Sequence, residues 1–439
     1  MQELFEASRV DKPATLDRQA GSDGTLGRLL NLERAQEIME RENLEALVAT
    51  SPENVTYLSG YDHLAHYVWD ELLEVFAVLS RDGTVDLVGS TDVVHYIAER
   101  PAEIDAMYLY GEFPIHRDPS AVLDGAEARV VEIEAAAVRC NSSVDGLRRV
   151  LLDRSIGTGR VAVDESGLSA DAWRDVNTSS ARGVTIVEGA SLLQETRMIK
   201  TEPEIERLRV GVSAVEAGIR TMFQALVVGI SESELETVFR AEVARLGTDP
   251  SFVEAAGGTR SGGLFPTSQY CLADGDVFRV DCGGRFGGYW ADTGRTAVLG
   301  RAKATTLVEY YDALRSGIEA MLEIIQPGLP LKELVDVAVS SVRANGLPHY
   351  ERRHVGHGIG ANLYEAPILL ESPEAGETIH VARSLVHATG PILEAGMVIN
   401  IELPYYEFGL GGLQIEDTVV VRDSGPEVLT SNSRDLYLG

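Results

Sequence analysis

Basic residues, cysteine and long apolar runs are all scarce in this chain of 439 residues. Lys and Arg number 38 against 68 Asp and Glu, which gives a formal net charge of −30. This charge repels phosphate backbones and anionic lipid headgroups, so nucleic acid and membrane surfaces are poor candidate partners. No run approaches the ~20 apolar residues of a membrane-spanning helix. The first residues also lack the basic and then apolar order of a secretion signal.

The three cysteines, Cys140, Cys271 and Cys282, cannot all pair, and none lies in a CxxC spacing. This usage fits a reducing compartment and predicts a cytoplasmic location. The acidic excess has two interpretations, a surface kept soluble by charge and an adaptation to a saline cytoplasm. With 44% hydrophobic and 24% charged residues, the chain is predicted to be globular.

The length favours two domains over one. Residues 1–25 are polar without a hydrophobic period, and we interpret them as a tail. Residues 26–185 show an α/β pattern that begins with an amphipathic helix over 28–44 and continues with strand-like runs at 46–50, 72–80 and 84–90.

The remainder, residues 186–439, repeats one order of elements twice. Two helical patterns at 203–227 and 232–246 precede strand-like runs at 277–284 and 289–300. The same order of two helices and two strands recurs between residues 306 and 421 without sequence identity between the copies. The pattern predicts an α/β (α+β) domain with two pseudo-symmetric halves that face each other across a shared cleft.

A pair of aspartates in VFRVDCGGRFGGYWADTGRT is the strongest local signal. A two-residue turn at Phe286 and Gly287 would place Asp281 directly opposite Asp292, with Cβ atoms ~5 Å apart. Two facing carboxylates destabilise a strand pair unless a cation lies between them, so a divalent metal is the economical explanation. The alternative, a longer or bulged turn with both carboxylates solvated, is equally open at this point.

One histidine and two glutamates extend this set. Glycines flank His357 in GHGIG and let the backbone approach a ligand closely. Glu402 and Glu416 each end an apolar run, where a charge is costly unless it is paired or metal-bound. Four carboxylates and one imidazole suit Mn²⁺, Fe²⁺, Co²⁺ or Zn²⁺, and can bridge two ions ~3.5 to 4 Å apart. The set predicts metal-assisted hydrolysis of an amide-like bond.

The spacing of the two aspartates, followed in order by GHGIG, GMVINIE and QIEDTVVV, resembles the M24 metallopeptidase family. SPENVTYLSGY resembles the family's creatinase-type N-terminal domain, and RMIKTEPEIERLR resembles the usual start of its pita-bread catalytic domain. The resemblance implies two divalent ions per subunit, with manganese favoured. It implies bridging roles for Asp292 and Glu416, and a role for Glu402 with the proton of the attacking water. The implied ligands are Asp281, Asp292, His357, Glu402 and Glu416.

The sequence departs from the family pattern at non-metal positions. Peptidases of the family usually have a histidine where LFPTSQYCLADGD has none, and another where this chain has Tyr364. Gln414 stands where many members have arginine, and His354 lies three residues before His357 where the accessory histidine is commonly four before. We expect Tyr364, His354 and Gln414 to contact substrate. Tyr364 would donate a hydrogen bond to an oxyanion, and His354 would move protons.

A polar and aromatic cluster follows the first strand and helix, at Tyr61, Asp62, His63, His66, Tyr67 and Trp69. The resemblance implies that this region reaches the active site of a partner subunit, so we expect a homodimer in which His63 and Trp69 contact substrate. An ordinary surface loop is the alternative interpretation.

These observations favour a dinuclear metal hydrolase that cleaves small Xaa-Pro peptides, as a dipeptidase or an aminopeptidase. Two alternatives stay open. The missing histidines favour hydrolysis of a small-molecule C–N bond, as in creatinase and ectoine hydrolase. A non-catalytic binding module on the same fold is the other, and the five retained ligand positions argue against it.

Overall fold

The computed structural model describes residues 27–62, 74–100, 102–179, 183–300, 305–372, 385 and 390–439. The predicted tail lies outside the described residues, as do His63, His66, Tyr67 and Trp69. Tyr61 is buried, and Asp62 is half-buried.

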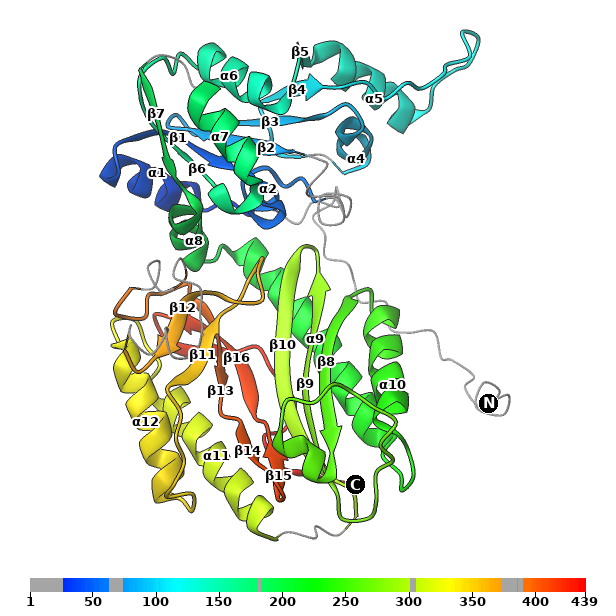
Figure 1. The fold of residues 1–439 in the computed structure, drawn as a ribbon, viewed down its shortest axis with the longest axis vertical. Coiled ribbons are helices and arrows are strands. Elements are labelled where there is room, and N and C mark those ends of the chain that lie inside the picture. Colours follow the sequence, from blue (N-terminus) through cyan, green and yellow to red (C-terminus); the bar gives the residue numbers. More distant parts are fainter. Residues whose placement is uncertain are drawn as a thin grey trace.

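A seven-stranded mixed sheet forms the N-terminal part of the fold, drawn at the top of Figure 1. Its order is β5-β4-β3-β2-β1-β6-β7, with β2 antiparallel to both neighbours and the other pairs parallel. The strands are β1 (Leu44–Ala49), β2 (Phe76–Ser80), β3 (Val85–Ser90), β4 (Ala106–Tyr110), β5 (Val138–Cys140), β6 (Gly159–Val163) and β7 (Val184–Glu188). The helices are α1 (Leu32–Arg41), α2 (Pro52–Ser59), α4 (Val93–Glu99), α5 (Gly125–Ala136), α6 (Ser143–Asp153) and α7 (Ala170–Ser179), with a 3-10 turn η1 (Glu165–Gly167).

Both faces of this sheet are covered, which explains why its central strands are apolar throughout. Along β1, Leu47 and Ala49 pack into one apolar cluster, whereas Ala46 and Val48 pack into another on the opposite face. A strand buried on both faces reads as a continuous apolar run, as predicted for residues 46–50.

The C-terminal part contains two helix pairs, each packed beside its own sheet (Figure 1). A capping box starts α10, the second helix of the first pair. The Ser231 hydroxyl accepts from Glu234 N at 3.2 Å, and the Glu234 carboxylate accepts from Ser231 N at 2.9 Å. The helices are α8 (Ala190–Met198), α9 (Glu202–Gln224), α10 (Glu232–Arg245), α11 (Thr305–Ile324) and α12 (Leu331–Ala344).

The two sheets of this part confirm the predicted α/β halves. The first, in the order β18-β10-β9-β8, contains β8 (Asp249–Gly257), β9 (Val277–Phe286), β10 (Tyr289–Val298) and β18 (Tyr437–Leu438). The second, in the order β12-β11-β13-β16-β17, contains β11 (His354–Gly358), β12 (Glu365–Leu370), β13 (Val398–Glu402), β16 (Glu416–Arg422) and β17 (Gly425–Val428). A 3-10 turn η2 (Gly258–Gly262) and a ribbon of β14 (Tyr405–Glu407) and β15 (Gly411–Leu413) complete it. The sequence patterns had not indicated β8, β11, β12 or β17.

The β9–β10 hairpin corrects one prediction. Its two-residue turn lies at Gly287 and Gly288, with φ of 54° and 85°, and not at Phe286 and Gly287. A tight hairpin turn needs positive φ at both central residues, which two glycines adopt without steric cost. The register therefore shifts by two residues, and Asp281 lies opposite Gly294 while Asp292 lies opposite Gly283. Because the shift is even, both carboxylates keep the same face of the sheet as diagonal neighbours.

A buried ionic network fastens the N-terminal part to the C-terminal part. Arg197 of α8 donates to the side chain of Asn54 in α2 and to that of Asn362, and it lies 3.1 Å from Glu365. Lys200 Nζ lies 2.8 Å from Glu365 Oε2. Arg197, Lys200 and Glu365 are all buried, and together they hold the segment before β12 against the domain junction.

Candidate metal centre

Three buried side chains from three strands converge where the two C-terminal sheets meet. Asp292 on β10, His357 on β11 and Glu416 on β16 each offer one ligand atom, and these atoms lie within 4.8 Å of one another. Strand β10 is joined to β16 directly, because Thr293 Oγ1 donates to the Glu416 carbonyl at 3.0 Å. The junction of the two halves thus sets the distances within the cluster.

Asp281 and Glu402 flank these three groups. Gln414 Nε2 reaches both Asp281 Oδ2, at 3.3 Å, and Glu416 Oε2, at 3.4 Å. Glu402 is the cross-strand partner of Glu416 on β13. The structure therefore brings together all five residues that the resemblance implied as ligands.

The carboxylates of the cluster repel one another strongly. Burial, followed by repulsion from Glu416, raises the pKa of Asp292 well above its ordinary value. Burial and repulsion from Asp281 do the same to the pKa of Glu416. Burial and Glu402 raise the pKa of Asp281 to about 7. Like charges at this density persist as carboxylates only when cations neutralise them.

Glu402 differs from the other three carboxylates. Burial would raise its pKa, but the Arg352 guanidinium and His354 outweigh burial and bring the pKa below its ordinary value. Arg352 Nη2 lies 3.2 Å from Glu402 Oε1, and His354 Nδ1 lies 3.1 Å from the same oxygen. Glu402 therefore stays ionised at neutral pH.

His357 is held neutral and oriented. Burial lowers its pKa to about 4. Its Nδ1 donates to the Gly358 carbonyl at 2.9 Å, which leaves the lone pair on Nε2, 3.7 Å from Asp292 Oδ2. A neutral imidazole oriented through its other nitrogen is the usual form of a histidine metal ligand.

The donor set fits divalent metal ions. Asp292 Oδ1 is buried and accepts no hydrogen bond within the described part of the chain. Buried polar atoms are normally satisfied, so a carboxylate oxygen without a protein donor at the centre of an acidic cluster fits a divalent cation as its partner.

Tyr364 covers the histidine. Its ring stacks on His357 with centroids 3.7 Å apart and an interplanar angle of 16°, and it lies 6.0 Å from the His354 ring. Burial and the nearby Glu402 raise the pKa of its phenol, so Tyr364 keeps its proton at neutral pH. His354 Nε2 is buried without a hydrogen-bond partner in the described residues. Tyr364 therefore faces the cavity, whereas His354 is buried behind it against Glu402.

A cavity of about 340 Å³ opens onto this cluster. Sequence reasoning missed several of its surroundings, among them Glu254 and Trp290 in the wall, and Arg352 and Asn400 around the carboxylates. Strand alternation could have found Trp290 and Asn400, which lie two residues before Asp292 and Glu402 on the same strands. The lining residues are Ser251, Phe252, Glu254, Asp281, Trp290, Asp292, Leu363 and Tyr364.

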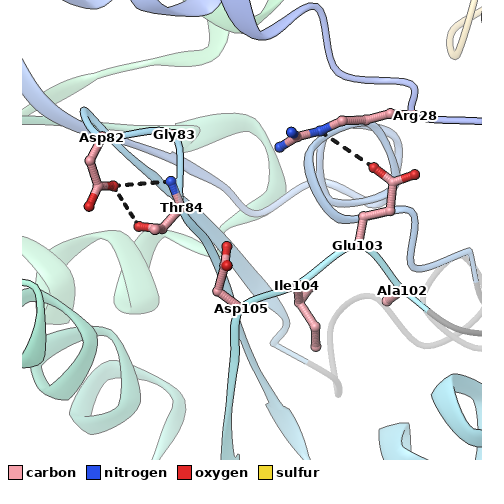
Figure 2. A pocket seen from close by; sticks show the side chains of 8 residues that line it. All are labelled: Arg28, Asp82, Gly83, Thr84, Ala102, Glu103, Ile104 and Asp105. Atoms are coloured by element: carbon pink, nitrogen blue, oxygen red, sulfur yellow. Dashed lines mark hydrogen bonds and ion pairs between the residues drawn. The ribbon is translucent and has the colours of Figure 1, made fainter.

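Another hollow, of about 360 Å³, lies in the N-terminal part of the fold (Figure 2). Its charged side chains all have partners in the structure, and Asp105 accepts from the Val85 amide at 2.8 Å. Arg28 pairs with Glu103 at 3.4 Å, and Asp82 accepts from both the amide and the hydroxyl of Thr84, at 3.0 and 2.7 Å. None of the five clustered residues lines this hollow, so it is separate from the candidate centre. Its lining residues are Arg28, Asp82, Gly83, Thr84, Ala102, Glu103, Ile104 and Asp105.

A mixed α/β fold of two half-domains, with a cavity that opens onto an acidic cluster at their junction, defines the class of a metal-dependent hydrolase. Residues 206–423 match the metallopeptidase family M24, and residues 31–210 match the creatinase/prolidase N-terminal domain. The chain belongs to the M24 family and is a metal-dependent hydrolase with a creatinase-type N-terminal domain and a pita-bread catalytic domain. Membership implies a dinuclear metal site.

Several relatives show the extent of the similarity. A probable dipeptidase PepE from Mycobacterium tuberculosis is 30% identical over 316 residues, which cover 70% of this chain and 79% of that protein. An Xaa-Pro dipeptidase from Pyrococcus furiosus is 27% identical over 56% of this chain and 66% of its own length. The crystal structure of a dipeptidase from Pyrococcus horikoshii superposes with a TM-score of 0.72 at 20% identity, covering 93% of this chain and 99% of that one.

No helix within the described ranges combines the length and the apolar character that crossing a bilayer requires.

Proposed function

We propose that this protein is a dinuclear metal hydrolase that cleaves Xaa-Pro peptide bonds in small peptides. The observation that carries the proposal is the orphaned Asp292 Oδ1 inside a cluster of four carboxylates and one neutral imidazole. Relatives that bear the names Xaa-Pro dipeptidase and probable dipeptidase support the substrate class. The proposed ligands are Asp281, Asp292, His357, Glu402 and Glu416, with manganese favoured and Asp292 and Glu416 as bridges.

The bound ions would activate a water molecule and polarise the scissile carbonyl. Glu402, kept ionised by Arg352 and His354, is placed to accept the proton of that water. Tyr364 retains its phenol proton and donates it as a hydrogen bond to the developing oxyanion. His354 contacts Glu402 Oε1 through Nδ1 at 3.1 Å and serves proton transfer through that carboxylate. Gln414 orients Asp281 and Glu416 through its amide.

Assembly, location and domain limits belong to the same proposal. We propose a homodimer in which the segment around Tyr61 to Trp69, with His63 and Trp69, borders the partner's cavity. The three free cysteines support a cytoplasmic location. The proposed limits are residues 26–185 and 186–439, and the last strand of the seven-stranded sheet, β7, ends at Glu188, close to the limit between them. An active monomer in analytical ultracentrifugation at assay concentration would contradict the assembly.

The test pairs metal content with proline release. The protein purified without added salts and then loaded with Mn²⁺ should bind two ions per chain and release proline from Xaa-Pro dipeptides. Asp292→Asn should lose both properties, because it removes a shared ligand oxygen. Asp82→Asn in the remote hollow is the matched control and should keep both. Full metal occupancy of Asp292→Asn by elemental analysis would overturn the ligand assignment.

A second candidate is hydrolysis of a small-molecule C–N bond. Among the described residues that line the cavity there is no basic side chain to hold a peptide carboxylate, and Gln414 contacts two acidic residues. A screen of dipeptides against ureido and cyclic amidine compounds separates the two, since each candidate predicts turnover of one group alone.

A further inference from the structure

Glu254 is a carboxylate in the cavity wall that the proposed metal ligands do not include. It lies on β8 directly opposite Asp281 of β9, so both side chains project from the same face of the sheet. Unlike the clustered carboxylates, Glu254 is exposed, and it lines the 340 Å³ cavity. The wall therefore carries one acidic group beyond those that the metals need.

No cation within the described residues neutralises Glu254. None of the ion pairs or hydrogen bonds in the described structure involves its side chain. By contrast, Asp281 contacts Gln414, and Asp292 lies beside His357. A carboxylate that faces a cavity and has no internal counter-charge is available to a cation that enters the cavity.

Aromatic groups complete the surroundings of this carboxylate. The ring of Phe252, two residues before Glu254, lies over Gly283 of the neighbouring strand. A Cβ atom at position 283 would be only 2.1 Å from this ring. Trp290 and Tyr364 line the same cavity. Aromatic faces beside a carboxylate attract organic ammonium groups through their ring quadrupoles, and they favour an alkylammonium over a hydrated metal ion.

We propose that Glu254 determines specificity by binding an alkylammonium group of the substrate, with Phe252, Trp290 and Tyr364 packed around its carbon chain. The inference rests on the proposed peptide function, because it names the substrate class for that cavity. The ammonium is either the α-amino group of the first residue or a lysine-like side chain on it. The chemistry is the same, and the experiment separates the two sources.

Binding is measured first, without turnover, on the full-length Mn²⁺-loaded protein by isothermal titration calorimetry. The probes are lysinamide, norleucinamide and N-acetylnorleucinamide. Glu254→Gln keeps the size of the side chain but removes its charge, so affinity for the bound ammonium should fall about tenfold. If affinity falls for lysinamide alone, Glu254 binds the side-chain ammonium. If affinity falls for both lysinamide and norleucinamide, Glu254 binds the α-amino group. Asp249→Asn, on the same strand outside the lining residues, is the control and should match the parent.

Turnover of Lys-Pro and norleucyl-Pro by the same variants keeps this inference separable from the proposed function. If Glu254→Gln weakens binding of the amines while no dipeptide yields proline, the ammonium site stands and the Xaa-Pro function fails. If parent and variant release proline equally from both dipeptides and bind the three amides equally, the function stands and the role of Glu254 is refuted.

Discussion

Removing the metal ions should make the stability of this protein fall as the pH rises through neutrality. In the metal-free centre the pKa of Asp281 is raised to about 7, and those of Asp292 and Glu416 are raised well above their ordinary values. Such a carboxyl keeps its proton in the folded state at a pH where the unfolded chain has lost it. Each retained proton therefore lowers the free energy of unfolding by about 1.4 kcal/mol per unit increase in pH.

The size of the effect depends on two opposing groups. For Asp281, raised from 3.8 to about 7, the shift is about 3 units, or at most about 4 kcal/mol lost between pH 4 and 7. Water that reaches this half-buried side chain reduces the figure. His357 acts in the opposite sense, because its pKa is lowered from 6.5 to about 4 and stability rises with pH over that interval. Above about pH 6.5 the opposing effect of His357 has ended, and each carboxyl group that still holds its proton lowers the free energy of unfolding by about 1.4 kcal/mol per unit increase in pH.

Urea unfolding followed by circular dichroism measures this slope at about pH 6.5, 7.5 and 8.5, with chelator or with saturating Mn²⁺. Bound metal displaces the protons, so the loaded protein should gain stability relative to the metal-free protein as the pH rises. Glu204, whose burial raises its pKa to about 7, titrates in both forms and cancels in the comparison. Asp292→Asn should flatten the metal-free slope. Metal-free stability that stays constant or rises across this window would refute the reasoning.

Three further predictions concern two side chains beside the metal centre and one buried ion pair at the domain junction. Tyr364→Phe should lower kcat about 10²- to 10³-fold with metal content unchanged, because it removes one oxyanion donor; unaltered kinetics would make Tyr364 a bystander. His354→Ala should lower kcat and alter its pH profile, since it removes both the free Nε2 and a partner of Glu402; a profile identical to the parent's would exclude a role in proton transfer. Lys200→Met should reduce the free energy of unfolding by about 3 to 5 kcal/mol, because it leaves Glu365 buried with one cation fewer; a urea midpoint like that of the exposed-pair variant Lys332→Met would contradict this.

Sequence patterns predicted those parts of the structure that depend on local chemistry. The start of α10 follows from Ser231 and Glu234, which are three residues apart and satisfy each other. The common face of Asp281 and Asp292 follows from the even period of a hairpin, whatever its turn. The fold class and family were recognised from motifs in chain order, and the comparisons confirm both.

Features that depend on distant partners could not be predicted in this way. The exact register of β9 and β10 depended on whether Phe286 or Gly288 occupies the turn, which positive φ decides in favour of glycine. Glu254 lies at the cavity because β8 pairs with β9, and no local pattern in the sequence indicates that pairing. The ion pair of Arg352 with Glu402 joins residues 50 positions apart, and no local period encodes it. Roles for His63 and Trp69 stay predictions, since these residues lie outside the described ranges.

The buried network of Arg197, Lys200 and Glu365 bears on whether the catalytic half is an independent module. A fragment that began at residue 206 would span the M24 match and retain the five clustered residues, yet it would lose both cations that neutralise Glu365. The carboxylate of Glu365, one position after Tyr364, would then be buried without either of these counter-ions. The N-terminal domain supplies Asn54 to the same network. Replacing this domain with that of a relative would therefore disturb the buried ion pairs. Recombination of such proteins should therefore succeed only at breakpoints that keep α2, α8 and the segment before β12 from one parent.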